Sequence, residues 1–238
     1  DTQIKAEATE TEESFSMKDL KSILTNKGFW LIALLCVVFY SAAFPFIKYA
    51  SDLMVNKFSV DPKFAGTIPG MLPFGAIILT PLFGRIYDKY GHGADLMIIG
   101  SFMIVIIHSL FAVPFINHWM AAVVLMILLG VAFSMVPSAM WPSLAKIMPE
   151  RQLGTTYALT FYIQNIGLWG MPVLIGYVLD KYCITGVNAV TGVNEYDYTL
   201  PMMIFAGMCS IAIVLAYMVK IEDKKKGYGL QLPNIKKK

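Results

Sequence analysis

Six long apolar runs constrain the fold of this chain more than any other feature. Each has about the 20 residues that a helix needs to cross the hydrocarbon core of a bilayer. Because a backbone in lipid must satisfy its own hydrogen bonds, such runs fold as helices. The sequence therefore predicts an all-α membrane protein with six transmembrane helices. The predicted helices cover residues 30–50, 65–84, 95–115, 120–142, 157–179 and 200–219.

The composition excludes most soluble classes of protein. Of the 238 residues, 57% are hydrophobic and 15% are charged, whereas soluble domains have about 45–50% apolar and about 25% charged residues. This balance excludes an ordinary soluble enzyme, a nucleic-acid-binding domain and a disordered protein. The net charge of +3 is too small to indicate a nucleic-acid partner.

The reactive side chains form no pattern that indicates catalysis or a cofactor. The three cysteines, Cys36, Cys183 and Cys209, are far apart in the sequence and predict neither a disulfide framework nor a metal site. We find no His-rich metal spacing, no intramembrane Ser/His pair and no paired carboxylates. We therefore expect no enzymatic activity, no metal and no cofactor.

The positive charges of the connections predict the orientation of the helices. Of the 19 Lys and Arg residues, 15 lie in the N-terminal arm, the second and fourth loops and the C-terminal tail. Because cytoplasmic loops carry the excess of Lys and Arg, both termini are predicted to be cytoplasmic. The chain then divides into an arm (1–27), a six-helix bundle (28–219) and a basic tail (220–238). Residues 17–27 form either a helix on the membrane surface or the end of a solvated linker.

An internal repeat appears when the chain is shifted by 92 residues. Pro45 then falls on Pro137, and Gly75 falls on Gly167. A four-residue motif also coincides, with Gly84, Asp88, Lys89 and Tyr90 falling on Gly176, Asp180, Lys181 and Tyr182. One copy follows the second span and the other follows the fifth, so the two copies lie on opposite sides of the membrane. This pattern predicts two inverted three-helix units; the alternative is chance matching between helices of similar composition.

The loop after the second span has a recognisable sequence. It reads Gly84-Arg85-Ile86-Tyr87-Asp88-Lys89-Tyr90-Gly91-His92-Gly93. The loop resembles the signature loop of the major facilitator superfamily, with matches at Gly84, Asp88, Lys89 and Gly91. His92 and Gly93 depart from that pattern, because they stand where the family has a basic pair. The resemblance implies that the six helices are half of a twelve-helix fold.

The signature loop suggests a conformational latch made of Gly84, Arg85, Asp88, Lys89 and Gly91. Gly84 would let a neighbouring helix approach closely. Asp88 would lie near a helix N-terminus, where the macrodipole favours a negative charge, and would pair with Lys89 or Arg85. The alternative is a basic loop that only sets the topology.

Several other stretches resemble one branch of this superfamily, the lysosomal dipeptide-exporting "domain-containing" proteins and their bacterial relatives. These stretches are residues 29–32, 39–47, 141–142, 149–157 and 163–168. The resemblance implies alternating-access transport, secondary-active or facilitative, of a small organic solute such as a small peptide. It also implies a partner, the N-terminal six-helix half. Because the first residue is Asp1 rather than Met, we expect this sequence to be a fragment of a longer chain. We expect a multi-pass protein of a bacterial inner membrane.

The resemblance further implies a central cavity lined by the first, second, fourth and fifth spans. Polar groups in the middle of a bilayer usually face such a cavity or the bundle interior. Amides can both donate and accept hydrogen bonds, as a peptide requires. The candidate substrate-binding residues are Gln164, Asn165, Tyr40, Trp141, Ser138 and Lys48. Hydrogen bonds between helices, or aromatic rings that fill space, are the alternative for these positions.

Coupling and substrate stay open at this stage. His108 is the one ionisable residue deep in a span. It is a candidate for a proton relay, and the alternative is a neutral side chain that bonds to a neighbouring helix. Apart from Asp95 at the cytoplasmic entrance of the third span, no Asp or Glu lies inside a predicted span, so facilitated diffusion and symport fit equally well. A sugar, drug or organic-anion carrier is the second interpretation, and a six-helix scaffold or receptor that transports nothing is the third.

Overall fold

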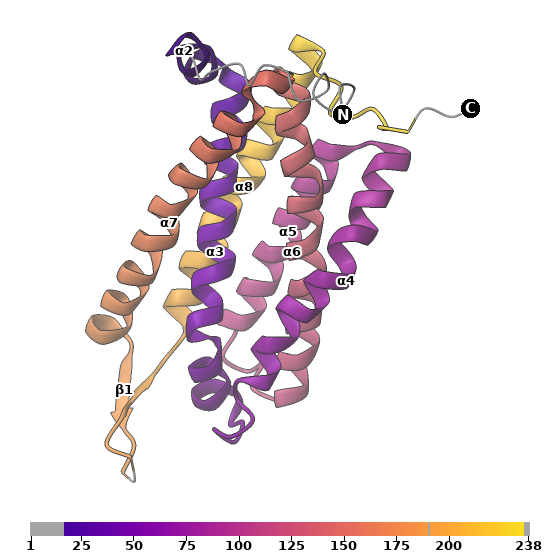
Figure 1. The fold of residues 1–238 in the computed structure, drawn as a ribbon. Coiled ribbons are helices and arrows are strands. Elements are labelled where there is room, and N and C mark those ends of the chain that lie inside the picture. Colours follow the sequence, from indigo (N-terminus) through magenta and orange to yellow (C-terminus); the bar gives the residue numbers. More distant parts are fainter. Residues whose placement is uncertain (1–16, 190, 236–238) are drawn as a thin grey trace, which may run out of the picture.

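The structure is a computed structural model that describes residues 17–189 and 191–235. Six of its helices are long and apolar enough to cross a membrane, which confirms the predicted fold class (Figure 1). They are α3 (Lys27–Phe58), α4 (Thr67–Tyr90), α5 (Gly93–Ala112), α6 (Trp119–Ile147), α7 (Leu153–Tyr182) and α8 (Thr199–Lys226). A short helix α2 (Met17–Thr25), a turn of 3-10 helix η1 (Glu150–Gln152) and two strands, β1 (Ile184–Val187) and β2 (Asn194–Tyr196), complete the described part.

The first long helix shows why the helices extend past the apolar runs. The side chain of Asn26 accepts hydrogen bonds from the backbone of Gly28 and Phe29, so α3 begins three residues before the predicted span. At its other end, the backbone N–H of Ser59, in the left-handed conformation, donates to the carbonyl oxygen of Met54 and closes the helix. These caps lie outside the apolar window that hydropathy detects, so the helix is longer than the predicted span.

The six helices form two equivalent sets. Helix α3 packs against α7 and α8, while α6 packs against α4 and α5. Helices α5 and α8 pack against each other behind α3 and α6, and α4 and α7 lie at opposite edges (Figure 1). Exchanging α3, α4 and α5 with α6, α7 and α8 leaves this list of neighbours unchanged. The two inverted three-helix units predicted from the sequence are therefore present.

The bounds of the helices also follow the 92-residue shift. Helices α3 and α6 begin at Lys27 and Trp119, and α4 and α7 end at Tyr90 and Tyr182. The shift fails for α5 and α8, because a hairpin of β1 and β2 precedes α8. The predicted spans leave residues 180–199 as a connection, so these two strands were not predicted.

The prolines of the second span do not interrupt its helix. Pro69 lies in the first turn of α4, where its missing N–H leaves no bond unmade, and Pro73 and Pro81 lie inside the helix. Prolines inside membrane helices are tolerated where neighbours satisfy the freed carbonyl groups. Helix α4 is therefore continuous from Thr67 to Tyr90.

The two edge helices bury little of their surface. Only 17% of the apolar window of α4 and 22% of that of α7 is buried, against 67% for α3. Side chains such as Phe74, Ile78 and Trp169 are more than 70% exposed. An apolar surface this large needs cover from lipid or from another membrane-embedded segment.

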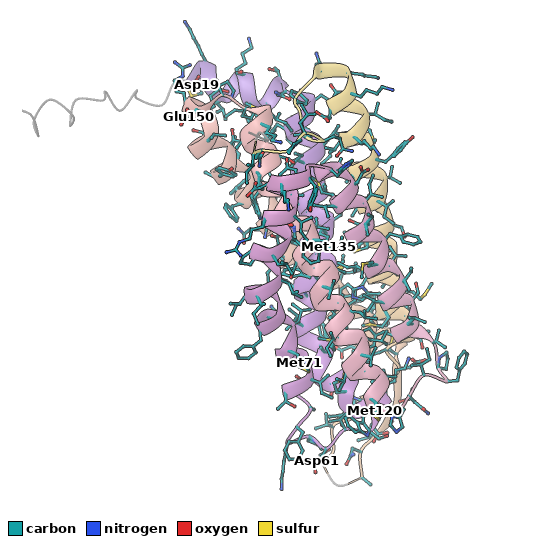
Figure 2. All side chains as sticks on the ribbon, turned by 90° about the vertical axis from the view of Figure 1, so that its right-hand side faces the viewer. Asp19, Asp61, Met71, Met120, Met135 and Glu150 are labelled. Atoms are coloured by element: carbon teal, nitrogen blue, oxygen red, sulfur yellow. The ribbon has the colours of Figure 1, made fainter. Side chains whose placement is uncertain are left out.

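The two ends of the bundle carry different connections. The end with α2, called the α2 end, also holds residues 228–235, which follow α8 (Figure 1). The hairpin of β1 and β2 lies at the opposite end, called the hairpin end. Figure 2 shows Asp19 and Glu150 at the first end and Asp61 and Met120 at the second. Residues 1–16 and 236–238 of the predicted arm and tail lie outside the described residues.

Helix α2 begins the described part of the predicted arm. Asp19 is buried and accepts hydrogen bonds from Arg151, at 2.6 Å, and from Gln152, at 2.9 Å. Ile23 is fully buried. Helix α2 is therefore fixed to the connection between α6 and α7.

Candidate functional site

An aromatic face lies where α3, α6 and α7 meet. Trp141 Nε1 donates to the hydroxyl oxygen of Tyr40 at 3.1 Å, which joins α3 to α6. The Trp141 ring stacks on Phe161 of α7 with 4.6 Å between centroids. Phe44 stacks on Tyr40 at 5.3 Å and Phe133 meets both rings. The contacts place two predicted site residues, Tyr40 and Trp141, side by side.

Gln164 lies next to this face and is held from α3. Its Oε1 accepts a hydrogen bond from the Cys36 thiol at 3.2 Å, and its side chain is buried. Cys36 precedes Tyr40 by one helical turn, so Gln164 lies beside the Tyr40–Trp141 pair. Close packing makes the contact possible, because Gly167, one turn further along α7, lies against Ser41 and Val37.

The other predicted binding residues are placed differently. Ser138 is buried and donates to the carbonyl oxygen of Met135 in its own helix. Asn165 is exposed and donates to the carbonyl oxygen of Phe161 in its own helix. Lys48 is exposed on α3, two turns beyond Tyr40, and forms no ion pair within the described residues. The structure therefore brings Tyr40, Trp141 and Gln164 together, and not Ser138 or Asn165.

The hydrogen bonds of this face leave some of its donors unused. Gln164 uses its oxygen to accept from Cys36, so its amide N–H groups are left to donate. Tyr40 uses its oxygen to accept from Trp141, so its own proton is left to donate. With the Lys48 ammonium, the face offers donors to an anionic or carbonyl group of a ligand.

Two contributors to this face were missed at the sequence level. Cys36 precedes Tyr40 by four residues, and helical spacing could have found it. Phe133 precedes the predicted site residue Trp141 by eight residues, and only its contacts with Tyr40 and Phe44 reveal its place.

The signature loop is mostly helical. Gly84, Arg85, Asp88 and Lys89 lie in the last two turns of α4, and Gly91 caps the helix with φ of +76°. No described atom beyond its own turn comes within 4 Å of a Cβ added at Gly84, so the close approach expected there is not made within this chain. Asp88 accepts from Asn234 Nδ2 at 2.6 Å and does not pair with Lys89 or Arg85.

His108 is fully buried between α3, α5 and α8. Its Nδ1 lies 3.1 Å from the carbonyl oxygen of Ile104 in its own helix, and its Nε2 has no partner within the described residues. The ring meets Phe46 at 5.0 Å and Phe205 at 5.5 Å. These contacts leave His108 in an aromatic environment away from the Tyr40–Trp141 face.

A polar cluster closes the hairpin end of α3. The hydroxyl of Tyr198, just before α8, donates to Asp52, and the backbone of Tyr196 donates to Asn56. Burial, together with the hydrogen bond to Asp52, raises the pKa of Tyr198 above its ordinary value. The hydroxyl of Tyr196 donates to Asp180 at 2.9 Å.

Comparison with known proteins places this arrangement in a family. Residues 1–172 match the model of the Major Facilitator Superfamily. The "Lysosomal dipeptide transporter MFSD1" of Danio rerio is 32% identical over 228 residues, which is 95% of this chain and 45% of that protein. The protein of the same name from Homo sapiens is 32% identical over 175 residues, covering 74% of this chain and 36% of that protein. The chain thus spans less than half the length of these relatives.

A solved structure has the same fold. The crystal structure of a mutant of peptide transporter POT in complex with sulfate superposes with a TM-score of 0.71 at 14% identity. The match covers 88% of this chain and 40% of that chain.

Proposed function

The chain belongs to the Major Facilitator Superfamily, and from this premise we propose that it is the second six-helix half of a transporter that moves small peptides by alternating access. Two inverted three-helix units are the build of each half of such transporters. The relatives named as dipeptide transporters match most of this chain with less than half of their own length. Their remaining length leaves room for the N-terminal half that we propose as the partner.

The observation that carries the proposal is the donor-bearing face of α3, α6 and α7. A peptide has a carboxylate at one end, and charge-assisted hydrogen bonds to such a group are the strong ones. Gln164, Tyr40 and Lys48 would bind this carboxylate, while Trp141 and Phe161 would pack against the peptide body. The N-terminal half would then supply acceptors for the amino end. Ser138 and Asn165 are lesser candidates, because their polar groups bond to their own helices.

The described acidic residues do not decide the coupling. Those in α3 to α8 lie within about two turns of a helix end, so none lies near the middle of the bundle. Facilitated diffusion needs no such group, and a symporter would take its buried carboxylate from the other half. We therefore propose secondary-active or facilitative transport, without enzymatic activity.

The protein is a multi-pass membrane protein, and we propose that both of its termini are cytoplasmic. The Lys and Arg residues at the α2 end support this orientation. In it, residues 17–27 lie at the cytoplasmic membrane surface as an arm, 28–219 form the bundle and 220–238 form the tail. A bacterial inner membrane is our proposed location, although the named relatives are lysosomal.

An organic-anion carrier is the second candidate function, because a face that offers only donors also fits an acid without an amino group. Sugar and drug carriers have less support, since a cation such as Lys48 has no partner in a neutral solute. A scaffold without transport leaves the arrangement of these donors without a role.

Uptake into proteoliposomes that contain the full-length transporter tests the proposal. A labelled dipeptide should be taken up, and a competitor with an amidated carboxyl end should compete at least tenfold less well. Losing a charge-assisted bond costs about 1.5–3 kcal/mol, and about 1.4 kcal/mol is tenfold in affinity.

Lys48→Met should reduce the discrimination against the amidated competitor, and Lys63→Met, at an exposed position outside the helices, serves as the matched control. Uptake of organic acids without uptake of peptides would favour the second candidate. No uptake of either solute would refute the transport proposal.

A further inference from the structure

The lysines of the two repeated motifs bind aromatic groups at opposite ends of the bundle. Lys89 Nζ lies 5.1 Å from the centroid of the Tyr90 ring, and Lys181 Nζ lies 5.5 Å from that of Tyr182 and donates to the hydroxyl of Tyr177 at 2.7 Å. Neither lysine forms an ion pair with the aspartate before it. The two aspartates are left for other partners, and the structure supplies one for each.

The first aspartate binds the segment that follows α8, residues 228–235, which we call the strap. Asn234 donates through Nδ2 to the Asp88 carboxylate at 2.6 Å. The backbone N–H groups of Asn234 and Ile235 both donate to the carbonyl oxygen of Asp88, at 2.9 and 3.0 Å. The strap therefore binds the last turn of α4 through both the side chain and the backbone of Asp88.

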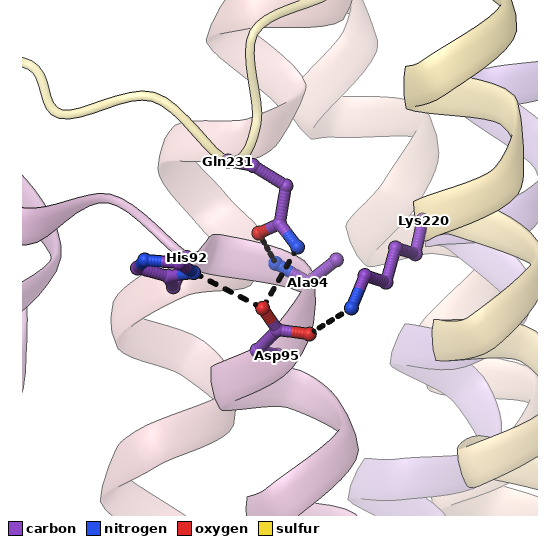
Figure 3. Close-up of polar contacts among 5 residues, drawn as sticks. All are labelled: His92, Ala94, Asp95, Lys220 and Gln231. Carbon is purple, nitrogen blue, oxygen red and sulfur yellow. Dashed lines mark hydrogen bonds and ion pairs between the residues drawn. The ribbon is translucent and has the colours of Figure 1, made fainter.

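The strap also follows the connection into α5 (Figure 3). The N–H of His92 donates to the carbonyl oxygen of Gln231, and that of Gly93 to Leu230. The Gln231 side chain accepts from the N–H of Ala94 and donates to Asp95 at 2.9 Å. The carboxylate of Asp95 also binds Lys220 of α8 at 2.6 Å.

The glycines of the signature loop fit the strap. A Cβ at Gly91 would collide with the carbonyl oxygen of Gln231, and a Cβ at Gly93 would lie 2.8 Å from that of Leu230. Position 93 is one of the two where this chain departs from the basic pair of the family. A long basic side chain at position 93 would meet the strap and the Tyr87 ring, so the departure has a structural reason.

The strap binds the second three-helix unit as well as the first. Lys146, near the end of α6, donates to the carbonyl oxygens of Gly229 and Leu232 at 2.9 and 3.0 Å. Asp223 of α8 accepts from the N–H of Leu230, which is fully buried. The strap therefore joins the two units at the α2 end.

The second aspartate is bound through its side chain at the hairpin end. Tyr196, in strand β2, donates to Asp180 of α7, and its backbone donates to Asn56 of α3. The hairpin therefore also joins the two units. Asp88 and Asp180, equivalent in the repeat, each bind a segment that lies outside the transmembrane helices.

We propose that Asp88 and Asp180 are docking points for two clasps, the strap and the hairpin, which release in turn as each end of the transporter opens. The latch predicted for the signature loop is then formed within this half rather than with the other half. The inference rests on the proposed transport function, because opening at alternate ends is what would release each clasp.

The cleanest test locks a clasp in the full-length transporter. In Asp88→Cys/Asn234→Cys, a short bifunctional methanethiosulfonate reagent joins the strap to α4, and a reductant frees it. We expect locking to slow uptake at least tenfold and the reductant to restore it. Asp180→Cys/Tyr196→Cys should behave in the same way at the hairpin end. The wild type and the single variants, treated alike, are the controls, because Cys36, Cys183 and Cys209 are buried.

Uptake by the locked protein at the rate of the reduced protein would overturn the proposal, since the clasps would then be permanent braces. Hydrogen exchange in the same membranes gives a readout that needs no solute. The amides of His92 and Gly93 should exchange at least tenfold more slowly in the locked protein than in the wild type. Equal exchange would also overturn the proposal. Absence of uptake by the wild type would instead count against the transport function alone.

Discussion

The crossing of α3 and α7 allows a prediction with a matched control. A Cβ at Gly167 would collide with Ser41 Oγ and lie 2.9 Å from Val37 Cγ1. At Gly170, three residues along the same helix, nothing lies within 4 Å of an added Cβ. Gly167→Ala should therefore separate α3 from α7, whereas Gly170→Ala should not.

The expected magnitude follows from these contacts. Extra atoms in a packed core cost about 1–3 kcal/mol, while replacing a glycine inside a helix by alanine gains about 1 kcal/mol. Gly167→Ala should then be less stable than Gly170→Ala by about 2 kcal/mol. Because the Cys36–Gln164 bond lies one turn away, peptide affinity should fall in Gly167→Ala as well.

Denaturant titration in micelles measures the free energy of unfolding of both variants. Ser41→Ala should partly rescue Gly167→Ala, since it removes the colliding oxygen and leaves Val37 in place. The buried Ser41 hydroxyl has no partner within the described residues, so its loss alone should cost little. Equal stability of the two glycine variants, or no rescue by Ser41→Ala, would refute this account of the crossing.

Three further predictions concern single side chains. Gln164→Ala should weaken peptide binding in reconstituted vesicles without loss of expression, whereas Asn165→Ala should bind as the parent does; equal affinity of all three proteins would contradict the site. His108→Phe should leave the pH profile of uptake unchanged, because Nε2 has no partner within the described residues; a lost pH dependence would indicate a proton relay. Tyr198→Phe should lower the free energy of unfolding by about 1–3 kcal/mol, since Asp52 loses a buried donor. The raised pKa of Tyr198 keeps the phenol protonated, so this stabilisation should be constant below about pH 10, the ordinary pKa of tyrosine, and be lost only as the pH rises through the raised value. Unfolding of both proteins at pH 7 and pH 9.5 measures it, and a difference that shrinks between these values would contradict the assignment.

The transmembrane helices could be predicted because their signal is local. Twenty apolar residues in a row have few alternatives in lipid, and a 92-residue repeat needs only comparison of the chain with itself. The strap and the hairpin could not be predicted in this way. Leu230 and Gln231 are held by bonds to residues more than 130 positions earlier, and neither segment has a strong pattern of its own.

The candidate site was predictable in part for a similar reason. Helical spacing places Tyr40, Phe44 and Lys48 on one side of a helix, and Gln164 stands out as an amide in an apolar run. Spacing does not say how helices rotate against each other. That rotation turns Gln164 toward Cys36, leaves Asn165 exposed and points Ser138 at its own backbone.

The repeat itself explains why symmetry gives the fold and not the site. Tyr49 and Trp141 are equivalent under the 92-residue shift. Each is an aromatic residue whose polar group donates a hydrogen bond to another helix. The Tyr49 hydroxyl donates to the carbonyl oxygen of Pro172 at 2.7 Å and braces α3 against α7. The Trp141 N–H instead reaches across to Tyr40, whose own equivalent is Ala132. The position that serves as a brace in one unit is therefore free to form the candidate site in the other.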